Sequence, residues 1–270
     1  MLGLVCIDID GTLIGQQKQV HPRVWQQAQV AREAGIHLAI CTGRPALSVT
    51  RGYAEQLNPQ GWHIFQSGAS LYHVGSGESR SHPLSQQALK VLLDLYREQG
   101  WVLELYSDHD YVVESFSDSV ADRQARCHAE LIDVPYLPRP LDSLEGNLVR
   151  AQWVVSDAQM PALMASAFEG VLYSSATSPS VPDSNFVSVT QAGVDKCSAI
   201  RELAELLGVP LAQTMMIGDG QNDIRAMELV GHSVAMQNGD PRLKAVCKYE
   251  VGHVDAGGVA EALDLAMNLV

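Results

Sequence analysis

The chain has 270 residues and a formal net charge of −13, with 46% hydrophobic and 18% charged residues. This balance is typical of a folded globular protein and excludes wholesale disorder. The length suits one large domain or a main domain with a smaller one inserted into it. Because an acidic surface repels the phosphates of nucleic acids and anionic lipids, we expect no nucleic acid and no membrane as a partner.

The cysteines and the first residues predict a cytoplasmic protein. The five cysteines form no CxxC pair, and Cys6 and Cys41 stand in apolar runs, so we expect buried free thiols and not a disulfide framework. Asp8 and Asp10 interrupt the first apolar run at once, unlike the pattern of a signal peptide. No apolar segment approaches the length of about 20 residues that spans a bilayer.

The first part of the chain alternates between strand and helix patterns. Residues 2–7 predict a buried parallel strand that ends at Asp8. A helix then runs from Pro22 to Gly35, a strand covers 36–40, a helix runs from Pro45 towards Leu57, and a third strand covers 62–65. This order predicts crossover units on a parallel sheet.

After about His82 the pattern changes to that of an α+β insert. We expect a helix capped by Ser85, a hairpin over 101–114, a helix over 118–129, a strand over 148–155, a helix over 161–168 and a strand over 171–174. Residues 178–182 predict an exit linker, since Pro179 and Pro182 lie there. The insert therefore covers residues 83–183 as a cap domain.

The crossover pattern returns in the last part of the chain. Strands are expected over 186–190 and 214–217, with a helix between them that ends at Gly208, and a final helix from Gly258. The predicted fold class is thus α/β, a Rossmann-like parallel sheet whose core is formed by residues 1–82 and 184–270, with the smaller α+β cap inserted.

Two aspartates stand where the first strand ends. Ligands of open α/β sheets bind beyond the carboxyl ends of the strands, and Asp8 and Asp10 are spaced so that both carboxylates can face one site. Gly11 permits a sharp turn, and Thr12 offers a hydroxyl. The alternative is a pair of turn or capping aspartates without chemistry.

A second acidic cluster, Gly218-Asp219-Gly220-Gln221-Asn222-Asp223, also follows an apolar strand. Asp219 and Asp223 would reach the same sheet edge as Asp8 and Asp10. Four carboxylates in one cleft repel one another unless a cation lies among them, and oxygen ligands of this kind suit Mg²⁺. The alternative is a glycine-rich turn with an ordinary helix cap.

Partners for a phosphate stand at matching places. Thr42-Gly43-Arg44 follows the strand over 36–40, and Pro45 is expected to open a helix whose N-terminus can bind an anion. Lys196 precedes another helix and would neutralise phosphate charge. The alternatives are a common threonine cap and a solvated lysine.

Together these four motifs resemble the haloacid dehalogenase superfamily: Asp8-Ile9-Asp10-Gly11-Thr12, Thr42-Gly43-Arg44, Lys196, and Gly218 to Asp223. More narrowly, the chain resembles the Cof-type phosphatases, which carry an α+β cap between the second and third motifs. The resemblance covers both parts of the divided core, whereas the cap is matched in placement and general pattern.

The resemblance implies a role for each motif residue. Asp8 is the nucleophile and a metal ligand, and Asp10 is the general acid and then the base, with its backbone carbonyl on the metal. Asp219 is a direct Mg²⁺ ligand, and Asp223 supports the metal or its waters. The phosphoryl group or the substrate is held by Thr42, Gly43, Arg44, Lys196 and Asn222.

Two positions depart from the family pattern. Many relatives have Asn-Gly-Ala after the third strand, where this chain has Ser67-Gly68-Ala69, so a contact made by the longer Asn is in doubt. The residue after the motif lysine is often Gly and here is Cys197, from which we expect an effect on packing only.

The sequence therefore predicts a Mg²⁺-dependent phosphatase that acts on a small phosphorylated metabolite, either a sugar phosphate or a phosphorylated cofactor such as FMN or pyridoxal phosphate, through an aspartyl-phosphate. The alternatives are a phosphomutase or phosphotransferase on the same scaffold and a silent phosphate-binding regulatory protein. A pure binder needs no protonatable Asp10 beside a nucleophile, and a dehalogenase needs neither Asp10 nor a metal. We expect the cap to set the specificity.

Overall fold

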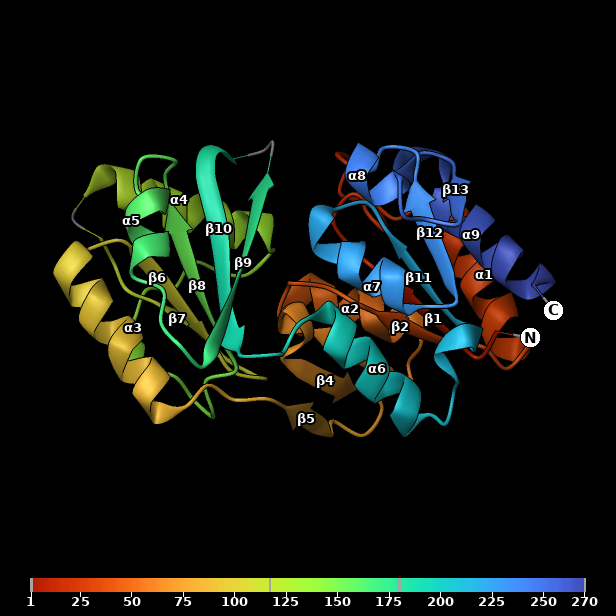
Figure 1. The fold of residues 1–270 in the computed structure, drawn as a ribbon, viewed down its shortest axis with the longest axis horizontal. Helices are drawn as coiled ribbons and strands as arrows, with labels where there is room; N and C mark the ends of the chain where they lie inside the picture. Colours follow the sequence, from red (N-terminus) through yellow and green to blue (C-terminus); the bar gives the residue numbers. More distant parts are fainter. Residues whose placement is uncertain (1, 117, 179–180, 270) are drawn as a thin grey trace. The chain divides into compact units, whose positions relative to one another are not determined.

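Two compact units make up the chain (Figure 1). The computed structural model describes residues 2–116, 118–178 and 181–269. Unit 1 comprises Met1–Gly43, Arg51–Ser79 and Asp195–Val270, and unit 2 comprises Arg44–Thr50 and Arg80–Val194. The chain thus leaves and re-enters unit 1, as the sequence predicted for a core with an insert.

A parallel sheet of five strands forms the centre of unit 1. Its strand order is β13-β12-β11-β1-β2, with the bounds β13 Tyr249–Val251, β12 His232–Met236, β11 Thr214–Gly218, β1 Leu4–Ile7 and β2 His37–Ile40. Every residue of β1 and β11 is buried. Both faces of these strands are therefore covered, which explains why they are continuous apolar runs in the sequence.

Helices cover the two faces of this sheet (Figure 1). On one face α1 (Pro22–Glu33) packs against α9 (Gly258–Asn268). On the other face α6 (Lys196–Leu206), α7 (Ile224–Leu229) and α8 (Pro241–Lys244) share a core with β1, β2, β11 and β12. Short 3₁₀ turns, η3 (Leu211–Gln213), η4 (Gln221–Asp223) and η5 (Val254–Ala256), join these elements. This layering confirms the predicted parallel α/β core.

The third strand does not extend the parallel sheet. β3 (Trp62–Phe65) pairs antiparallel with β4 (Ser70–His73), and β5 (Ser79–Ser81) completes a separate three-stranded sheet. Only one parallel bridge, Cys41 to Ile64, joins β3 to the end of β2 within the described residues.

Side chains form hydrogen bonds with the backbone groups along the free edge of β2. The backbone N–H of Ile40 donates to Nδ1 of His63 at 3.0 Å, and Asn58 Nδ2 donates to the carbonyl of Leu38 at 3.0 Å. Nε2 of His63 bonds the carbonyl of Asn58 at 3.0 Å. Because these bonds replace ladder bonds, the parallel sheet stops at β2.

Unit 2 is built on an antiparallel sheet of five strands in the order β7-β6-β8-β10-β9. The bounds are β7 Tyr111–Val113, β6 Val102–Tyr106, β8 Arg150–Val155, β10 Val181–Gln191 and β9 Val171–Ser178. It is accompanied by the helices α3 (Gln86–Gln99), α4 (Ser119–Leu131) and α5 (Met160–Ala165) and by the 3₁₀ turn η2 (Leu141–Ser143). The predicted α+β character of the insert is confirmed.

The two faces of this sheet contribute to different cores. Leu103, Trp153 and Val187 face α3 and α5, whereas Val102, Val154 and Phe186 face α4. The cap predicted at Ser85 is present, since Ser85 accepts from Ala88 N–H, and α4 begins near the predicted Asp118, which accepts from two of its backbone N–H groups. Local capping thus fixes where these helices begin.

The insert extends further than expected. The strand predicted for the second core segment over 186–190 lies instead in β10, which pairs with β8 and β9. The boundary at 183 is therefore wrong, because unit 2 continues to Val194. The physical reason is that Phe186 and Val187 point to opposite faces and each joins a core of unit 2. Residues 178, 181 and 182 of the expected linker lie in strands, and 179–180 lie outside the described residues.

The segment after Gly43 also differs from the prediction. Helix α2 spans Ser48–Leu57, so Pro45 does not open it. Residues Arg44–Thr50 belong to unit 2, where Arg44 Nη1 donates to Asp133 Oδ2 at 2.9 Å and Leu47 packs against an apolar cluster. These contacts outweigh the preference of proline for a helix start, and the helix N-terminus expected near Thr42 is not there.

Among the described residues, no helix has the length and apolar character needed to cross a membrane.

The buried imidazole of His63 predicts acid sensitivity. Burial lowers the pKa of His63 to about 3, with the bond to Asn58 opposing this effect and His37 and His73 adding to it. Since the unfolded chain takes up a proton near pH 6.5 and the folded chain does not, the free energy of unfolding should fall as pH drops from about 6.5 to about 3. The contribution is about 1.4 kcal/mol for each pH unit.

Urea unfolding of wild type and His63→Gln at several pH values tests this contribution. The variant should be less stable at pH 7, because it loses the paired bonds, and its stability should depend less steeply on pH. Parallel pH profiles of the two proteins would contradict the assignment.

Candidate active site

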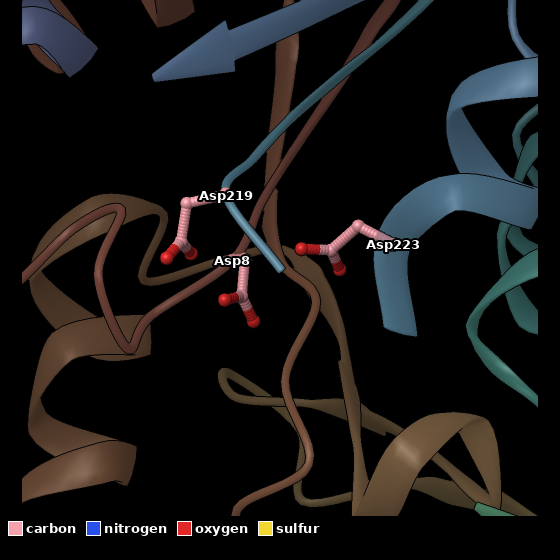
Figure 2. A group of neighbouring side chains, drawn as sticks. All are labelled: Asp8, Asp219 and Asp223. Atoms are coloured by element: carbon pink, nitrogen blue, oxygen red, sulfur yellow. The ribbon is translucent and has the colours of Figure 1, made fainter. Parts of the chain in front are cut away.

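Asp8 and Asp219 lie side by side at the carboxyl edge of the parallel sheet (Figure 2). Asp8 follows β1 and Asp219 follows β11, and the two strands are neighbours in register, with Ile7 opposite Ile217. The backbone N–H of Asp8 donates to the carbonyl of Ile217 at 3.0 Å. Adjacent parallel strands therefore deliver both carboxylates to one place, as the spacing of the motifs predicted.

Lys196 joins this edge from the first turn of α6. Its Nζ donates to Oδ1 of Asp8 at 2.6 Å and to Oδ1 of Asp223 at 2.7 Å. All three side chains are at most 8% exposed. The helix begins there because Asp195 caps it. Its carboxylate accepts a hydrogen bond from Ser198 N–H, and the Ser198 hydroxyl oxygen accepts one from Asp195 N–H.

Glycine is required where the carboxylates meet the backbone. A side-chain carbon on Gly11, whose φ is +83°, would lie 2.1 Å from Oδ2 of Asp219. One on Gly218 would lie 2.6 Å from Oδ2 of Asp223. Beside them the Thr12 hydroxyl donates to Oδ1 of Asp219 at 3.0 Å. The two glycines thus leave room for the carboxylates of Asp219 and Asp223, while the Thr12 bond holds Asp219 in place.

Burial and mutual repulsion control the charge of this group. Burial raises the pKa of Asp8 well above its usual range; Lys196 opposes this, while Asp223, Asp219 and Asp10 add to it. The pKa of Asp219 is raised to about 7, first by burial and then by Asp223. For Lys196, burial lowers the pKa, but Asp223 and Asp8 outweigh it, so the pKa of the ammonium is raised.

The donor set fits a hard divalent cation. Carboxylate oxygens of Asp8, Asp219 and Asp223 lie within 4.8 Å of one another. One lysine compensates only one of three carboxylates, so the group retains negative charge that a second cation would neutralise. Oxygen donors with few protein ligands are what Mg²⁺ prefers.

Four further residues of unit 1 were predicted to belong to the site: Asp10, Thr42, Gly43 and Asn222. Asp10 is exposed, and its carboxylate is not one of the three grouped oxygens, although its charge acts on Asp8 and Asp219. Thr42 is 1% exposed and follows β2 directly. Gly43 adjoins Thr42, and Asn222 is exposed in η4. Their roles towards phosphate remain predictions.

Arg44 belongs to the other unit. Its guanidinium is 3% exposed and pairs with Asp133 within unit 2. Unit 2 also contains a cavity of about 260 Å³, lined among others by Leu47, His109, Val134 and Arg139. A role for Arg44 in binding substrate remains a prediction.

Two structural features carried no role in the sequence prediction. Asn238 Nδ2 donates to the carbonyl of Gly11 at 2.7 Å, and its Oδ1 accepts from Val254 N–H at 3.0 Å, so it holds the turn after Asp10. The loop Gln66–Gly68 contacts the backbone near Thr42 and Lys196. The departure at Ser67 was a visible signal of this loop, whereas the bonds of Asn238 depend on contacts between distant segments.

Known proteins share this architecture over nearly the whole chain. Residues 5–263 match the family of haloacid dehalogenase-like hydrolases. A phosphoglycolate phosphatase of Natronomonas pharaonis is 38% identical over 267 residues, which are 98% of each chain. A 5-amino-6-(5-phospho-D-ribitylamino)uracil phosphatase of Bacillus subtilis is 23% identical over 96% of each chain.

A solved structure of similar fold is a sugar phosphatase of subclass IIB of the haloacid dehalogenase superfamily. It superimposes with a TM-score of 0.81 and 20% identity over 99% of this chain and 100% of that one. At this level of identity the likeness concerns the fold, and it agrees with the α/β core described above.

The chain belongs to the haloacid dehalogenase-like hydrolases. Within that superfamily it is a phosphatase of the Cof type, as its four motifs predicted.

Removing the buried ammonium group of Lys196 should destabilise the metal-free protein. Lys196→Met leaves the buried carboxylates without their ammonium, and breaking such a pair costs about 3–5 kcal/mol of unfolding free energy. The loss should be largest at pH 8 and smaller at pH 5, where Asp8 and Asp219 can carry protons. Denaturant unfolding at both pH values measures it.

The matched control is Lys90→Met, which removes an exposed lysine paired with Asp94. We expect little change there, since exposed pairs contribute little. Equal losses from both substitutions would show that the buried lysine has no special role in stability.

Proposed function

We propose that the enzyme is a Mg²⁺-dependent phosphatase that hydrolyses a small phosphorylated metabolite through an aspartyl-phosphate on Asp8. The observation that carries the proposal is the buried contact of Lys196 with Asp8, next to the grouped oxygens of Asp219 and Asp223. The proposal is supported because a carboxylate, a fixed ammonium and a set of oxygen donors lie together at one sheet edge.

In the first proposed step an oxygen of the Asp8 carboxylate attacks the phosphorus of the monoester. A bond forms between that oxygen and phosphorus, while the bond from phosphorus to the leaving oxygen breaks. Asp10 donates its proton to the departing oxygen, so the product leaves as an alcohol. Lys196 bonds Oδ1 of Asp8, and its charge reduces the repulsion between the anionic nucleophile and the anionic substrate.

In the second proposed step water attacks the phosphorus of the aspartyl-phosphate. Asp10, now ionised, takes a proton from the water, and the bond between phosphorus and the Asp8 oxygen breaks. Inorganic phosphate leaves, and Asp8 returns to its starting state. Thr42 and Lys196 are proposed to hold the phosphoryl oxygens through both displacements, so that positioning and charge supply most of the rate enhancement.

Asp8, Asp219, Asp223 and the backbone carbonyl of Asp10 are the groups proposed to hold Mg²⁺. When bound, the ion supplies positive charge that stabilises the phosphoryl oxygens in the transition state. Thr12 and Asn238 keep Asp219 and the Asp10 turn in place through their hydrogen bonds.

A small phosphorylated metabolite is supported by what the related enzymes are named to act on. One relative is a phosphatase of phosphoglycolate, and another acts on a phosphorylated ribitylaminouracil. We propose that unit 2 selects among such compounds, because it carries the sequence inserted between the motifs of unit 1. A panel of phosphorylated metabolites, with release of inorganic phosphate as the readout, identifies the substrate and distinguishes hydrolysis from transfer to another acceptor.

Asp8→Asn should abolish turnover without unfolding the protein. The amide cannot form the acyl-phosphate, so kcat with p-nitrophenyl phosphate should fall by at least roughly a thousand-fold. Since burial already disfavours the charged form of Asp8, a neutral isostere should leave the melting temperature of the metal-free protein unchanged or higher.

The control for this substitution is Asp94→Asn, which changes an exposed aspartate of α3 and should keep wild-type turnover. Near-normal turnover of Asp8→Asn, or a phosphoenzyme trapped on another residue, would refute the assignment of the nucleophile.

Binding of Mg²⁺ should release a proton below neutral pH. Because the pKa of Asp219 is raised to about 7 in the metal-free protein, the ion must displace that proton, and its apparent affinity should rise with pH through this range. The limit is about tenfold for each pH unit. Calorimetry in two buffers of different ionisation enthalpy measures the number of protons released.

Thr12→Val supplies the matched variant, since the hydroxyl bond lowers the pKa of Asp219. Its loss should raise the pKa of Asp219 and so move the rise in affinity to higher pH. Treatment with EDTA should also stop turnover, and added Mg²⁺ should restore it. A pH-independent affinity, or turnover that resists the chelator, would contradict the metal site.

A further inference from the structure

Three consecutive residues of unit 1 have left-handed backbone conformations. Gln66, Ser67 and Gly68 form the 3₁₀ turn η1 between β3 and β4, with φ values of +56°, +58° and +99°. For the first two this conformation is uncommon, because both carry a side chain. Backbone outliers of this kind persist only where the surroundings hold them in place.

One side of the η1 turn is bonded to the segment that carries Thr42. The backbone N–H of Ser67 donates to the carbonyl of Thr42 at 3.0 Å, and Thr42 N–H donates to the carbonyl of Ile64 at 3.0 Å. The Ser67 hydroxyl lies close to Gly43, since a side-chain carbon there would be 3.2 Å from it. Thr42 is thus held by two backbone bonds, one to Ile64 of β3 and one from Ser67 in the middle of the turn.

The other side of the η1 turn is packed against the start of α6. A side-chain carbon on Gly68 would lie 2.2 Å from the carbonyl oxygen of Asp195 and 3.0 Å from the backbone nitrogen of Lys196. Only glycine permits this approach, both because of the space and because of its φ. Gly68 therefore lies against the backbone of Lys196, and the preceding residue, Ser67, bonds Thr42.

We propose that the left-handed turn Gln66–Gly68 is a positioning element that sets the separation of Thr42 from Lys196, and that Ser67 acts through its backbone conformation and not through its hydroxyl. This inference rests on the proposed function, in which Thr42 and Lys196 hold the same phosphoryl group. A turn with three fixed φ values between these two residues keeps their spacing constant while the phosphoryl group moves from Asp8 to water. Small misplacements of such groups reduce the rate strongly.

Four substitutions of Ser67 separate conformation from hydroxyl chemistry. Thr keeps the hydroxyl and Val lacks it, but both are β-branched and disfavour positive φ. Asn and Gly lack the hydroxyl and accept positive φ readily. We expect Ser67→Thr and Ser67→Val to lower kcat for p-nitrophenyl phosphate by about tenfold or more, with KM changing less than kcat, whereas Ser67→Asn and Ser67→Gly should keep kcat within about threefold.

Inhibition by vanadate supplies a readout that lost stability alone would not move. Vanadate imitates the phosphoryl group in transit, so its inhibition constant should rise across the series by about the same factor as kcat/KM falls. Gly68→Ala should show the same linked change. Circular dichroism and thermal unfolding identify any variant that does not fold, in which case the Thr and Asn pair decides the question.

The opposite ranking, in which Thr keeps activity while Asn and Gly lose it, would show that the hydroxyl contacts substrate and would overturn the proposal. Equal activity of all four folded variants would overturn it as well. Failure of the proposed function is distinguishable, because wild-type protein would then release no phosphate from any monoester in the presence of Mg²⁺.

Discussion

A single buried lysine holds the proposed catalytic edge together. Lys196 of α6 bonds Asp8 and Asp223 at the same time, although Asp8 follows β1 and Asp223 lies in η4. Three carboxylates without this ammonium would repel one another in a place from which water is largely excluded. The ion pair between Lys196 and Asp8 therefore joins the first and the last of the three sequence segments of unit 1, and it provides charge that the proposed phosphoryl transfer requires.

The positive charge of Lys196 does not balance the carboxylates at this sheet edge. One ammonium faces three carboxylates, and the pKa values of Asp8 and Asp219 are raised first by burial and then by repulsion from the neighbouring carboxylates. A divalent cation relieves that repulsion, so binding of metal and order of the site support each other. Thr12 and Asn238 do not contact the phosphoryl group in the proposed reaction. Their hydrogen bonds hold the Asp219 carboxylate and the turn after Asp10, respectively.

In the proposed function, unit 1 carries the chemistry and unit 2 selects the substrate. The motifs of unit 1 stand on a parallel sheet whose central strands are buried on both faces, which gives the reacting groups a rigid base. Unit 2 has its own antiparallel sheet and its own cores. Relatives named for different phosphorylated compounds share the whole length of both. This division accords with a fixed reaction and a variable choice of substrate.

Features that depend on local pattern were predictable from the amino-acid sequence. They include the apolar runs that end in Asp8 and Gly218, the helix cap at Ser85, the helix start at Asp118 and the α+β character of the insert, because periodicity and capping act over a few residues. The places of Phe186 and Arg44, and the departure of β3 from the parallel sheet, emerged only from the folded protein. Those outcomes follow from partners far along the chain: the cores that accept β10, the carboxylate of Asp133 that draws Arg44 into unit 2, and the imidazole of His63 that occupies the edge of β2. Distant contacts of this kind leave no periodic signal in the sequence.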